Sequence, residues 1–243
     1  MPSRITCEVR DESPVTVVRI AGALDLATMR VVHRVLDRCL TAQPDALVVD
    51  LHDITVRDQL ALSVFAAAAR RAAGWPAVPF VLCAPPAQTA SWLTESTACR
   101  GLPVRRDCAE ATRAAVAAAA PRLRVRLEPV AGACRRAREL VADACGRWNL
   151  PELVGPASVV LSELVGNVVR HARTPMTVTL TLRRPYLQVA VADDSRAAAR
   201  MGAAPDPRAE GGRGLLLVRE LTQRWGSAPL VDGKVVWAML PAA

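Results

Sequence analysis

The chain has 243 residues, 51% of them hydrophobic and 22% charged, which is the composition of a globular protein and not of a disordered or fibrous one. At about 100 to 150 residues per domain, this length predicts two compact domains. Aromatic residues make up only 3% of the chain, which disfavours binding of single-stranded nucleic acid by base stacking. Because no run approaches about 18 consecutive apolar residues and the first 25 residues are rich in charge, we expect a cytoplasmic protein with no membrane partner.

The positive charge is concentrated in the second half of the chain. Residues 1–121 hold 13 Arg and 12 acidic residues, a net charge of +1, whereas residues 122–243 hold 18 basic and 11 acidic residues, a net charge of +7. This favours an anionic partner such as a nucleotide or an acidic protein surface. No recognition-helix motif accompanies the Arg residues, so we expect no direct nucleic-acid binding. Because Lys234 is the single Lys, coding bias explains the excess of Arg equally well.

The seven Cys residues show no C-x-x-C spacing, and the three His residues lie far from most of them. We therefore expect neither a zinc site nor a disulfide framework, and we expect most of the thiols to be reduced.

In chain order, the first half alternates β-rich and helical segments. The alternation predicts a parallel or mixed sheet covered by helices. The boundary falls near Pro121, after an Ala-rich helix, so the first domain is predicted to span residues 1–120. The predicted strands are 16–20, 46–51 and 79–83, and the predicted helices are 27–40, 59–74, 86–96 and 108–120.

The second half, residues 121–243, is predicted to form the other domain of an α/β (α+β) protein. Period-two alternation predicts an antiparallel sheet with Thr residues on its outer face. An irregular stretch over 194–213 is too long for an ordinary connection, which is typical of a functional loop. The other predicted elements are strands 123–127, 177–182, 187–192 and 234–240, helices 131–147, 157–173 and 215–225, and a hairpin turn at Asp232-Gly233.

The helix over 157–173 carries a polar stripe. Glu163, Asn167 and His171 are four residues apart, so they project from roughly one side. An Asn oxygen is a hard ligand that suits Mg²⁺ bound also to phosphate, and a Glu one turn away could orient or deprotonate an attacking hydroxyl. Taken alone, the stripe fits a solvated helix face better than it fits a nucleotide site.

Two later features favour nucleotide binding over that simpler interpretation. The strand over 187–192 ends at Asp193, whose carboxylate could accept a hydrogen bond from the adenine amino group. The segment Glu210-Gly-Gly-Arg-Gly214 precedes a helix, where glycines let the backbone approach phosphate and the helix N-terminus supplies free N–H groups. The order of these features is more specific than any one of them.

The segments SELVGNVVRHA, VADDS, EGGRGLLLVRELTQRWG and GKVVWAML resemble the serine-kinase-type anti-sigma factors, a branch of the ATPase superfamily shared by histidine kinases and gyrase B. The resemblance covers about residues 123–241 and implies a two-layer α/β sandwich that binds ATP and Mg²⁺. It implies that Glu163 is the catalytic base, that Asn167 holds Mg²⁺ and that residues 195–210 form an ATP lid. The residues that it implies for cofactor binding are Asn167, Arg170, His171, Asp193, Ser195, Gly211, Gly212, Arg213 and Gly214.

Two positions depart from the family pattern. Gly166 stands where a larger residue is more common, and Val235 stands where a Thr is common near the nucleotide. These departures bear on phosphotransfer more than on nucleotide binding.

In the first half, GALDLAT (22–28) and LVVDLHDITVRD (47–58) resemble the STAS domain of anti-sigma factor antagonists, over about residues 4–118. The resemblance implies a mixed sheet with helices. In that family, Asp-Ser-Ser-Gly-Leu carries a phosphorylatable Ser, whereas this chain has Asp58-Gln-Leu-Ala-Leu62. Neither Gln59 nor Leu60 can accept phosphate, which leaves Thr55 and Ser63 as the nearby hydroxyl groups.

Together the two resemblances predict a partner-switching regulator of transcription. Its C-terminal domain binds Mg-ATP and acts as a serine/threonine kinase on STAS antagonist proteins, or sequesters a sigma factor, while the degenerate STAS domain docks on it or on another partner. The alternative is a non-catalytic module in which ATP sets the affinity for a sigma factor or an antagonist. Homodimerisation is implied by the resemblance alone. A histidine kinase is disfavoured because no separate helix with a phosphoacceptor His precedes the ATP-binding half.

Overall fold

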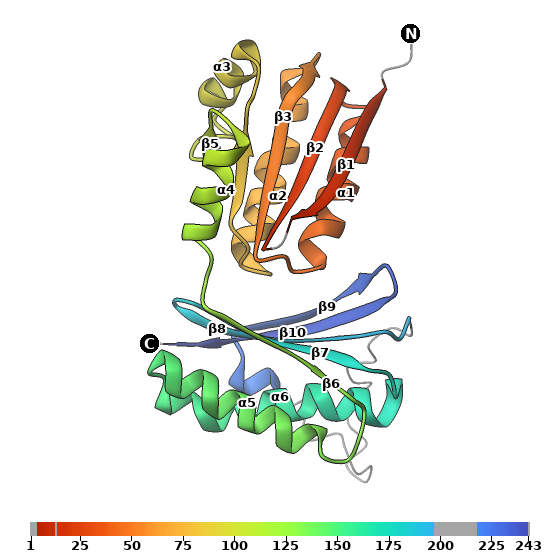
Figure 1. The fold of residues 1–243 in the computed structure, drawn as a ribbon, viewed down its shortest axis with the longest axis vertical. Helices are drawn as coiled ribbons and strands as arrows, with labels where there is room; N and C mark the ends of the chain where they lie inside the picture. Colours follow the sequence, from red (N-terminus) through yellow and green to blue (C-terminus); the bar gives the residue numbers. More distant parts are fainter. Residues whose placement is uncertain (1–3, 13, 197–217, 243) are drawn as a thin grey trace. The chain divides into compact units, whose positions relative to one another are not determined.

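The computed structural model describes residues 4–12, 14–196 and 218–242 (Figure 1). The chain divides into two compact units, Met1–Ala120 and Pro121–Ala243. Each unit has hydrophobic core clusters of its own.

The first unit is built on a five-stranded mixed sheet in the order β1-β2-β3-β4-β5. β1 runs antiparallel to β2, and the other neighbours are parallel. Its strands are β1 (Ile5–Glu12), β2 (Val15–Leu24), β3 (Ala46–Val56), β4 (Phe80–Cys83) and β5 (Val104–Arg105). Its helices are α1 (Met29–Thr41), the 3-10 helix η1 (Gln59–Leu62), α2 (Ser63–Gly74), α3 (Ala87–Glu95) and α4 (Cys108–Ala117).

Helices cover both faces of this sheet (Figure 1). Leu47, Val49 and Leu51 of β3 belong to the core under α1 and α2, while Val48 belongs to the core under α4. A strand that is buried on both faces reads as a continuous apolar run, which is why β3 was recognisable in the sequence.

The second unit is a two-layer sandwich. Its five-stranded antiparallel sheet has the order β6-β7-β8-β10-β9, and its helices pack on one face. The strands are β6 (Arg122–Leu127), β7 (Met176–Arg183), β8 (Tyr186–Asp193), β9 (Arg224–Leu230) and β10 (Gly233–Pro241). The helices are α5 (Ala133–Trp148), the 3-10 helix η2 (Pro151–Leu153), α6 (Val154–Asn167) and the π-helix η3 (Val168–Ala172). Both units confirm the predicted α/β (α+β) fold class.

Two predictions about the second unit were wrong. The helix predicted over 215–225 is helical over 218–221 within the described residues, and Arg224 already begins β9, because residues 224–230 pair with β10 across a tight turn. The aliphatic residues Val178 and Leu180 lie in the helix-covered core as the alternation predicted, but Thr179 and Thr181 on the other face are buried and not exposed. Arg122 donates a hydrogen bond to the Thr181 hydroxyl.

Among the described residues, the helical run Pro151–Ala172 is long and apolar enough by length and composition to cross a membrane. It contributes Val160, Leu161, Leu164 and Val165 to the core against α5 and the sheet. The core helix of a globular unit meets the same test.

One pair of cysteines departs from the reduced state that we expect for most of the thiols. Cys83, the last residue of β4, is joined to Cys108, the first residue of α4, in a disulfide. They are 25 positions apart and meet only because α4 folds back on the sheet. The other five cysteines are free, as predicted.

Candidate nucleotide-binding site

The polar stripe of α6 lies opposite its core face. Val160, Leu164 and Val168 are buried in the core, whereas Glu163 and Asn167 are half-buried. The helix therefore presents a carboxylate and an amide side by side at its C-terminal end.

The helix changes its winding directly after Asn167. Residues Val168–Ala172 form a π-helix, which ends at Arg173 in the left-handed conformation, where the Arg173 N–H donates to the Val168 carbonyl at 2.7 Å. This wider turn, with hydrogen bonds to the fifth residue, lies between Asn167 and His171, so His171 is outside the α-helical part of the stripe. The His171 side chain is exposed.

Arg170 contacts both Asn167 and Glu163 of the stripe. Its guanidinium donates to Asn167 Oδ1 at 3.0 Å, and its Nη2 lies 3.6 Å from Glu163 Oε2. Gly166 makes room for this contact, because a Cβ atom at that position would lie 3.1 Å from Arg170 Nη1. A cationic group thus bridges the two side chains that the sequence predicted as base and magnesium ligand.

Asp193 ends β8 on the helix-covered face of the sheet. It follows Leu187, Val189 and Val191 on that face, and its side chain is fully buried. Asp193 Oδ1 accepts hydrogen bonds from the Ser195 N–H at 2.9 Å and from Lys234 Nζ at 2.8 Å. Oδ2 is buried and has no hydrogen-bond donor in the described part of the chain.

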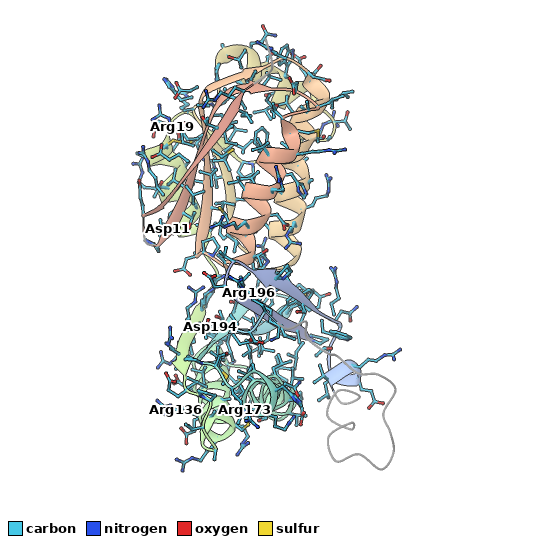
Figure 2. The ribbon with its side chains drawn as sticks, turned by 90° about the vertical axis from the view of Figure 1, so that its right-hand side faces the viewer. Asp11, Arg19, Arg136, Arg173, Asp194 and Arg196 are labelled. Carbon is cyan, nitrogen blue, oxygen red and sulfur yellow. A yellow bond between two sulfur atoms is a disulfide. The ribbon has the colours of Figure 1, made fainter. Side chains whose placement is uncertain are left out.

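The end of β8 lies beside the end of the helix that carries Glu163 and Asn167. Asp193 pairs with Met176, the first residue of β7, which follows that helix after a short connection. The Asp194 N–H donates to the Thr174 hydroxyl at 3.2 Å within this connection. Figure 2 labels Asp194, the residue after β8, and Arg173, the residue after the π-helix η3. The fold therefore brings the predicted adenine contact and the predicted magnesium ligand to one edge of the sandwich.

The remaining predicted site residues fall into two groups. Ser195 directs its backbone N–H at Asp193, and its carbonyl lies 3.4 Å from Lys234 Nζ. Beyond it, Arg196 pairs with Asp232 at 3.1 Å. The predicted contacts of Gly211, Gly212, Arg213 and Gly214, and the predicted lid from residue 197 on, lie outside the described residues.

Sequence reasoning missed Lys234. The residue is the single Lys of the chain and interrupts an apolar strand, which was the available signal. Its partner could be named only from the pairing of β8 with β10, which sets Lys234 directly opposite Asp193.

The residues present fit a magnesium nucleotide. The orphaned Asp193 Oδ2 is a buried acceptor that suits an N–H donor such as the adenine amino group. Asn167 and Glu163 offer the hard oxygen ligands that Mg²⁺ takes together with phosphate and water oxygens.

In the first unit, the segment that the sequence predicted as an acceptor loop without its serines begins at Asp58 and forms η1. Asp58 caps η1, with its side chain accepting the Leu60 N–H at 2.8 Å. Gln59 and Leu60 are exposed at the tip, and Leu60 is 72% exposed. Of the two remaining hydroxyl groups, Thr55 is exposed on β3 and Ser63 is half-buried at the start of α2.

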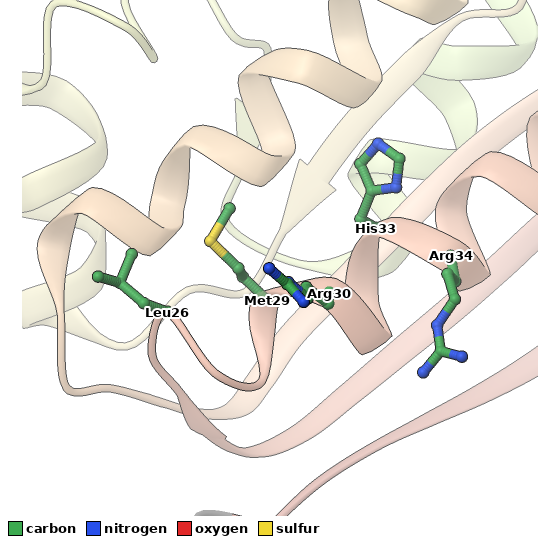
Figure 3. Close-up of a pocket in the computed structure, with 5 residues that line it drawn as sticks. All are labelled: Leu26, Met29, Arg30, His33 and Arg34. Atoms are coloured by element: carbon green, nitrogen blue, oxygen red, sulfur yellow. The ribbon is translucent and has the colours of Figure 1, made fainter.

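A surface depression lies at the start of α1 in the same unit. Its volume is about 740 Å³. Its lining combines apolar and basic side chains, and such a lining is better suited to binding a protein surface than a small anion. Figure 3 shows its lining residues Leu26, Met29, Arg30, His33 and Arg34.

Comparison with protein families gives one match in each unit. The family model described as "Histidine kinase-like ATPase domain" matches residues 125–239, and that of the STAS domain matches residues 6–111. No curated protein matches the chain.

Three solved structures are similar to parts of the chain. An anti-sigma factor antagonist from Mycobacterium paratuberculosis is 22% identical, with 47% of this chain and 97% of that one covered and a TM-score of 0.43. The RsbU and RsbW domains of a Mycobacterium tuberculosis protein are 17% identical, with 51% and 34% covered and a TM-score of 0.38. The histidine kinase domain of a blue-light activated histidine kinase from Erythrobacter litoralis is 23% identical, with 37% and 45% covered and a TM-score of 0.30. The chain thus spans less than half of the last two chains.

Proposed function

We propose that the chain is a partner-switching regulator whose second domain binds Mg-ATP and phosphorylates STAS antagonist proteins on Ser or Thr. The matches to a STAS domain and to a histidine kinase-like ATPase domain in one chain support this proposal. The observation that carries the proposal is the buried Asp193 carboxylate, which lies beside the helix of Glu163 and Asn167 and whose Oδ2 has no hydrogen-bond donor among the described residues. A buried acceptor without a donor is costly, so a ligand N–H at this point would be favoured.

The chemistry divides among three side chains. Asp193 Oδ2 would accept the adenine amino group and so orient the base. Asn167 Oδ1 would hold Mg²⁺, which when bound neutralises phosphate charge. Glu163 would take the proton of the substrate hydroxyl. At the same time the hydroxyl oxygen bonds to the γ-phosphorus, and the bond from that phosphorus to the bridging oxygen of ADP breaks. Arg170 must release Asn167 Oδ1 before that oxygen can bind a metal ion.

The STAS domain of the same chain is proposed as a docking module and not as the substrate. Its acceptor loop offers Gln59 and Leu60 in place of two serines. The substrate would be a separate STAS protein with an intact Asp-Ser-Ser-Gly sequence.

A transfer assay tests the proposal with the full chain, labelled ATP and such a STAS protein. We expect Glu163→Gln to lower transfer by roughly 100-fold or more while ATP still binds, since a positioned general base contributes about that much. Asn167→Ala should lose magnesium-dependent binding as well. The control is Glu139→Gln, which removes a carboxylate from the exposed face of α5. Transfer that is independent of Glu163, or absent from the unmodified chain, would contradict the kinase assignment.

A second candidate function is favoured by one observation. Because Arg170 engages both Asn167 and Glu163, the site is also suited to a non-catalytic module that binds ATP only to set its affinity for a sigma factor or an antagonist. Calorimetric ATP binding without transfer, together with partner retention that depends on ATP, would support this candidate.

A further inference from the structure

We propose that Lys234 is a positioning residue for the base-recognition carboxylate, and that it makes the site select 6-aminopurines over 6-oxopurines. The inference rests on the proposed nucleotide binding and extends it to a residue with no assigned role. Its partner is Asp193, which it faces across two strands.

The ion pair lies at the buried end of the sheet. Lys234 Nζ is 2.8 Å from Asp193 Oδ1, and the two side chains are 14% and 0% exposed. Lys234 lies on the helix-covered face with Val236, Ala238 and Leu240 of its own strand. The pair is therefore part of the site and not a solvated surface contact.

The contacts on the carboxylate are distributed unequally. Oδ1 receives the Lys234 ammonium and the Ser195 N–H, while Oδ2 receives no donor from the described residues. Two donors on one oxygen fix the rotation of the carboxylate and leave Oδ2 as an acceptor only. Such an oxygen matches the amino group of a 6-aminopurine and leaves the carbonyl oxygen of a 6-oxopurine facing another acceptor.

The turn before β10 supports this placement. Gly233 has a φ of 152°, and a Cβ atom there would collide with the carbonyl oxygen of Asp193. The absence of a side chain lets the hairpin approach the end of β8 closely. Lys234 follows immediately and enters the sheet in register with Asp193.

Stability alone gives no reason to keep this pair. Two charges taken out of water lose hydration that their attraction only partly restores, and a packed apolar pair is often as stable. A function for the open oxygen does give a reason, because the pair holds a carboxylate in the core in one defined orientation.

The test measures affinities for ATP and inosine triphosphate, a 6-oxopurine, by calorimetry with Mg²⁺ on the full chain. We expect Lys234→Met to weaken ATP binding on the order of tenfold or more, the effect of one hydrogen bond to a charged group, and to change inosine triphosphate binding less. The ratio of the two affinities therefore falls. Lys234→Arg should restore much of the ratio, and Arg224→Met, which removes one positive charge from the exposed start of β9, should leave it unchanged.

A second variant keeps the test valid if Lys234→Met fails to fold. Asp193→Asn combined with Lys234→Met removes both charges, and its amide can offer either an acceptor or a donor to the base. We expect it to bind the two nucleotides with similar affinities.

Each other result contradicts a different claim. If the unmodified chain binds ATP but Lys234→Met keeps its selectivity, the positioning role is wrong. Equal weakening of both nucleotides would mean that Lys234 contacts the phosphates instead, which also overturns it. If the unmodified chain binds neither nucleotide, the proposed function itself fails.

Discussion

Arg170 is the side chain that decides which groups around Asn167 are available. Its guanidinium takes the amide oxygen at 3.0 Å and lies close to Glu163. Gly166 permits this arrangement because it has no side chain to oppose the guanidinium. The departure from the family pattern at position 166 therefore has a local structural consequence.

Gly166→Ala tests that consequence. Its Cβ would crowd Arg170 Nη1, so we expect the guanidinium to shift and the magnesium concentration needed for half-maximal ATP binding to fall. Alanine in a helix should also raise the free energy of unfolding by up to about 1 kcal/mol. Calorimetry and urea unfolding measure the two effects.

Gly155→Ala is the matched control, because a Cβ atom on Gly155 of the same helix meets nothing within 4 Å. It should stabilise the helix without changing the magnesium requirement. Identical magnesium titrations for the two variants would show that Arg170 does not compete with the metal ion.

Residue types and spacing supplied the candidate site residues, but contacts across the fold did not follow from them. Glu163, Asn167 and Asp193 were recognisable because a helix period and a strand end are local properties. Lys234 was missed because its contact with Asp193, which lies 41 positions earlier in the sequence, depends on the register of two paired strands. The π-turn between Asn167 and His171 was not predicted, because such a turn leaves no periodic signal in the sequence.

At the level of elements, strands buried on two faces were the easiest to predict. β3 and β4 read as apolar runs, whereas β1 is an edge strand that carries charged residues and β5 has only two residues, so both were missed. The first two residues of β9, Arg224 and Trp225, were placed in the preceding helix, because their strand conformation depends on pairing with β10.

The link between β4 and α4 gives a prediction about stability. A disulfide that closes 25 residues stabilises a fold by about 3 kcal/mol in the chain-entropy description. We expect dithiothreitol to lower the free energy of unfolding of the first unit in the unmodified chain and to have little effect on Cys108→Ser. Urea unfolding with and without the reductant measures the difference.

Cys7→Ser provides the control within the same unit, because Cys7 is a free, half-buried thiol. It should keep the dependence on reductant. Burial raises the pKa of Cys39 to about 11, so that thiol stays protonated and unreactive near neutral pH. If the reductant acts equally on all variants, the disulfide does not stabilise the unit.

At the scale of the whole molecule, one chain matches both a histidine kinase-like ATPase domain and a STAS domain, so the proposed kinase activity raises the question of transfer between the two units. Restoring serines with Gln59→Ser and Leu60→Ser should make the first domain a substrate, since Asp58 still caps the loop. We expect ATP-dependent phosphorylation of this variant, lost again with Glu163→Gln, and detected by mass spectrometry. A rate that is independent of protein concentration would indicate transfer within one chain.

Leu26→Ser is the control, because it adds a hydroxyl to an exposed position, 52% accessible, outside the acceptor loop. It should remain unphosphorylated. If a separate STAS protein is phosphorylated while the restored loop is not, the loop lacks more than its hydroxyl groups.

The single Lys of the chain makes the buried ion pair open to chemical study. Reagents that acylate primary amines find one lysine side chain, and that amine is held against Asp193. Its acylation rate relative to that of the chain's N-terminal amine would report how often the pair opens. Labelling usually gives a mixture of molecules modified at different lysines. Here the modification of a lysine side chain can occur at Lys234 alone, so its rate is read directly.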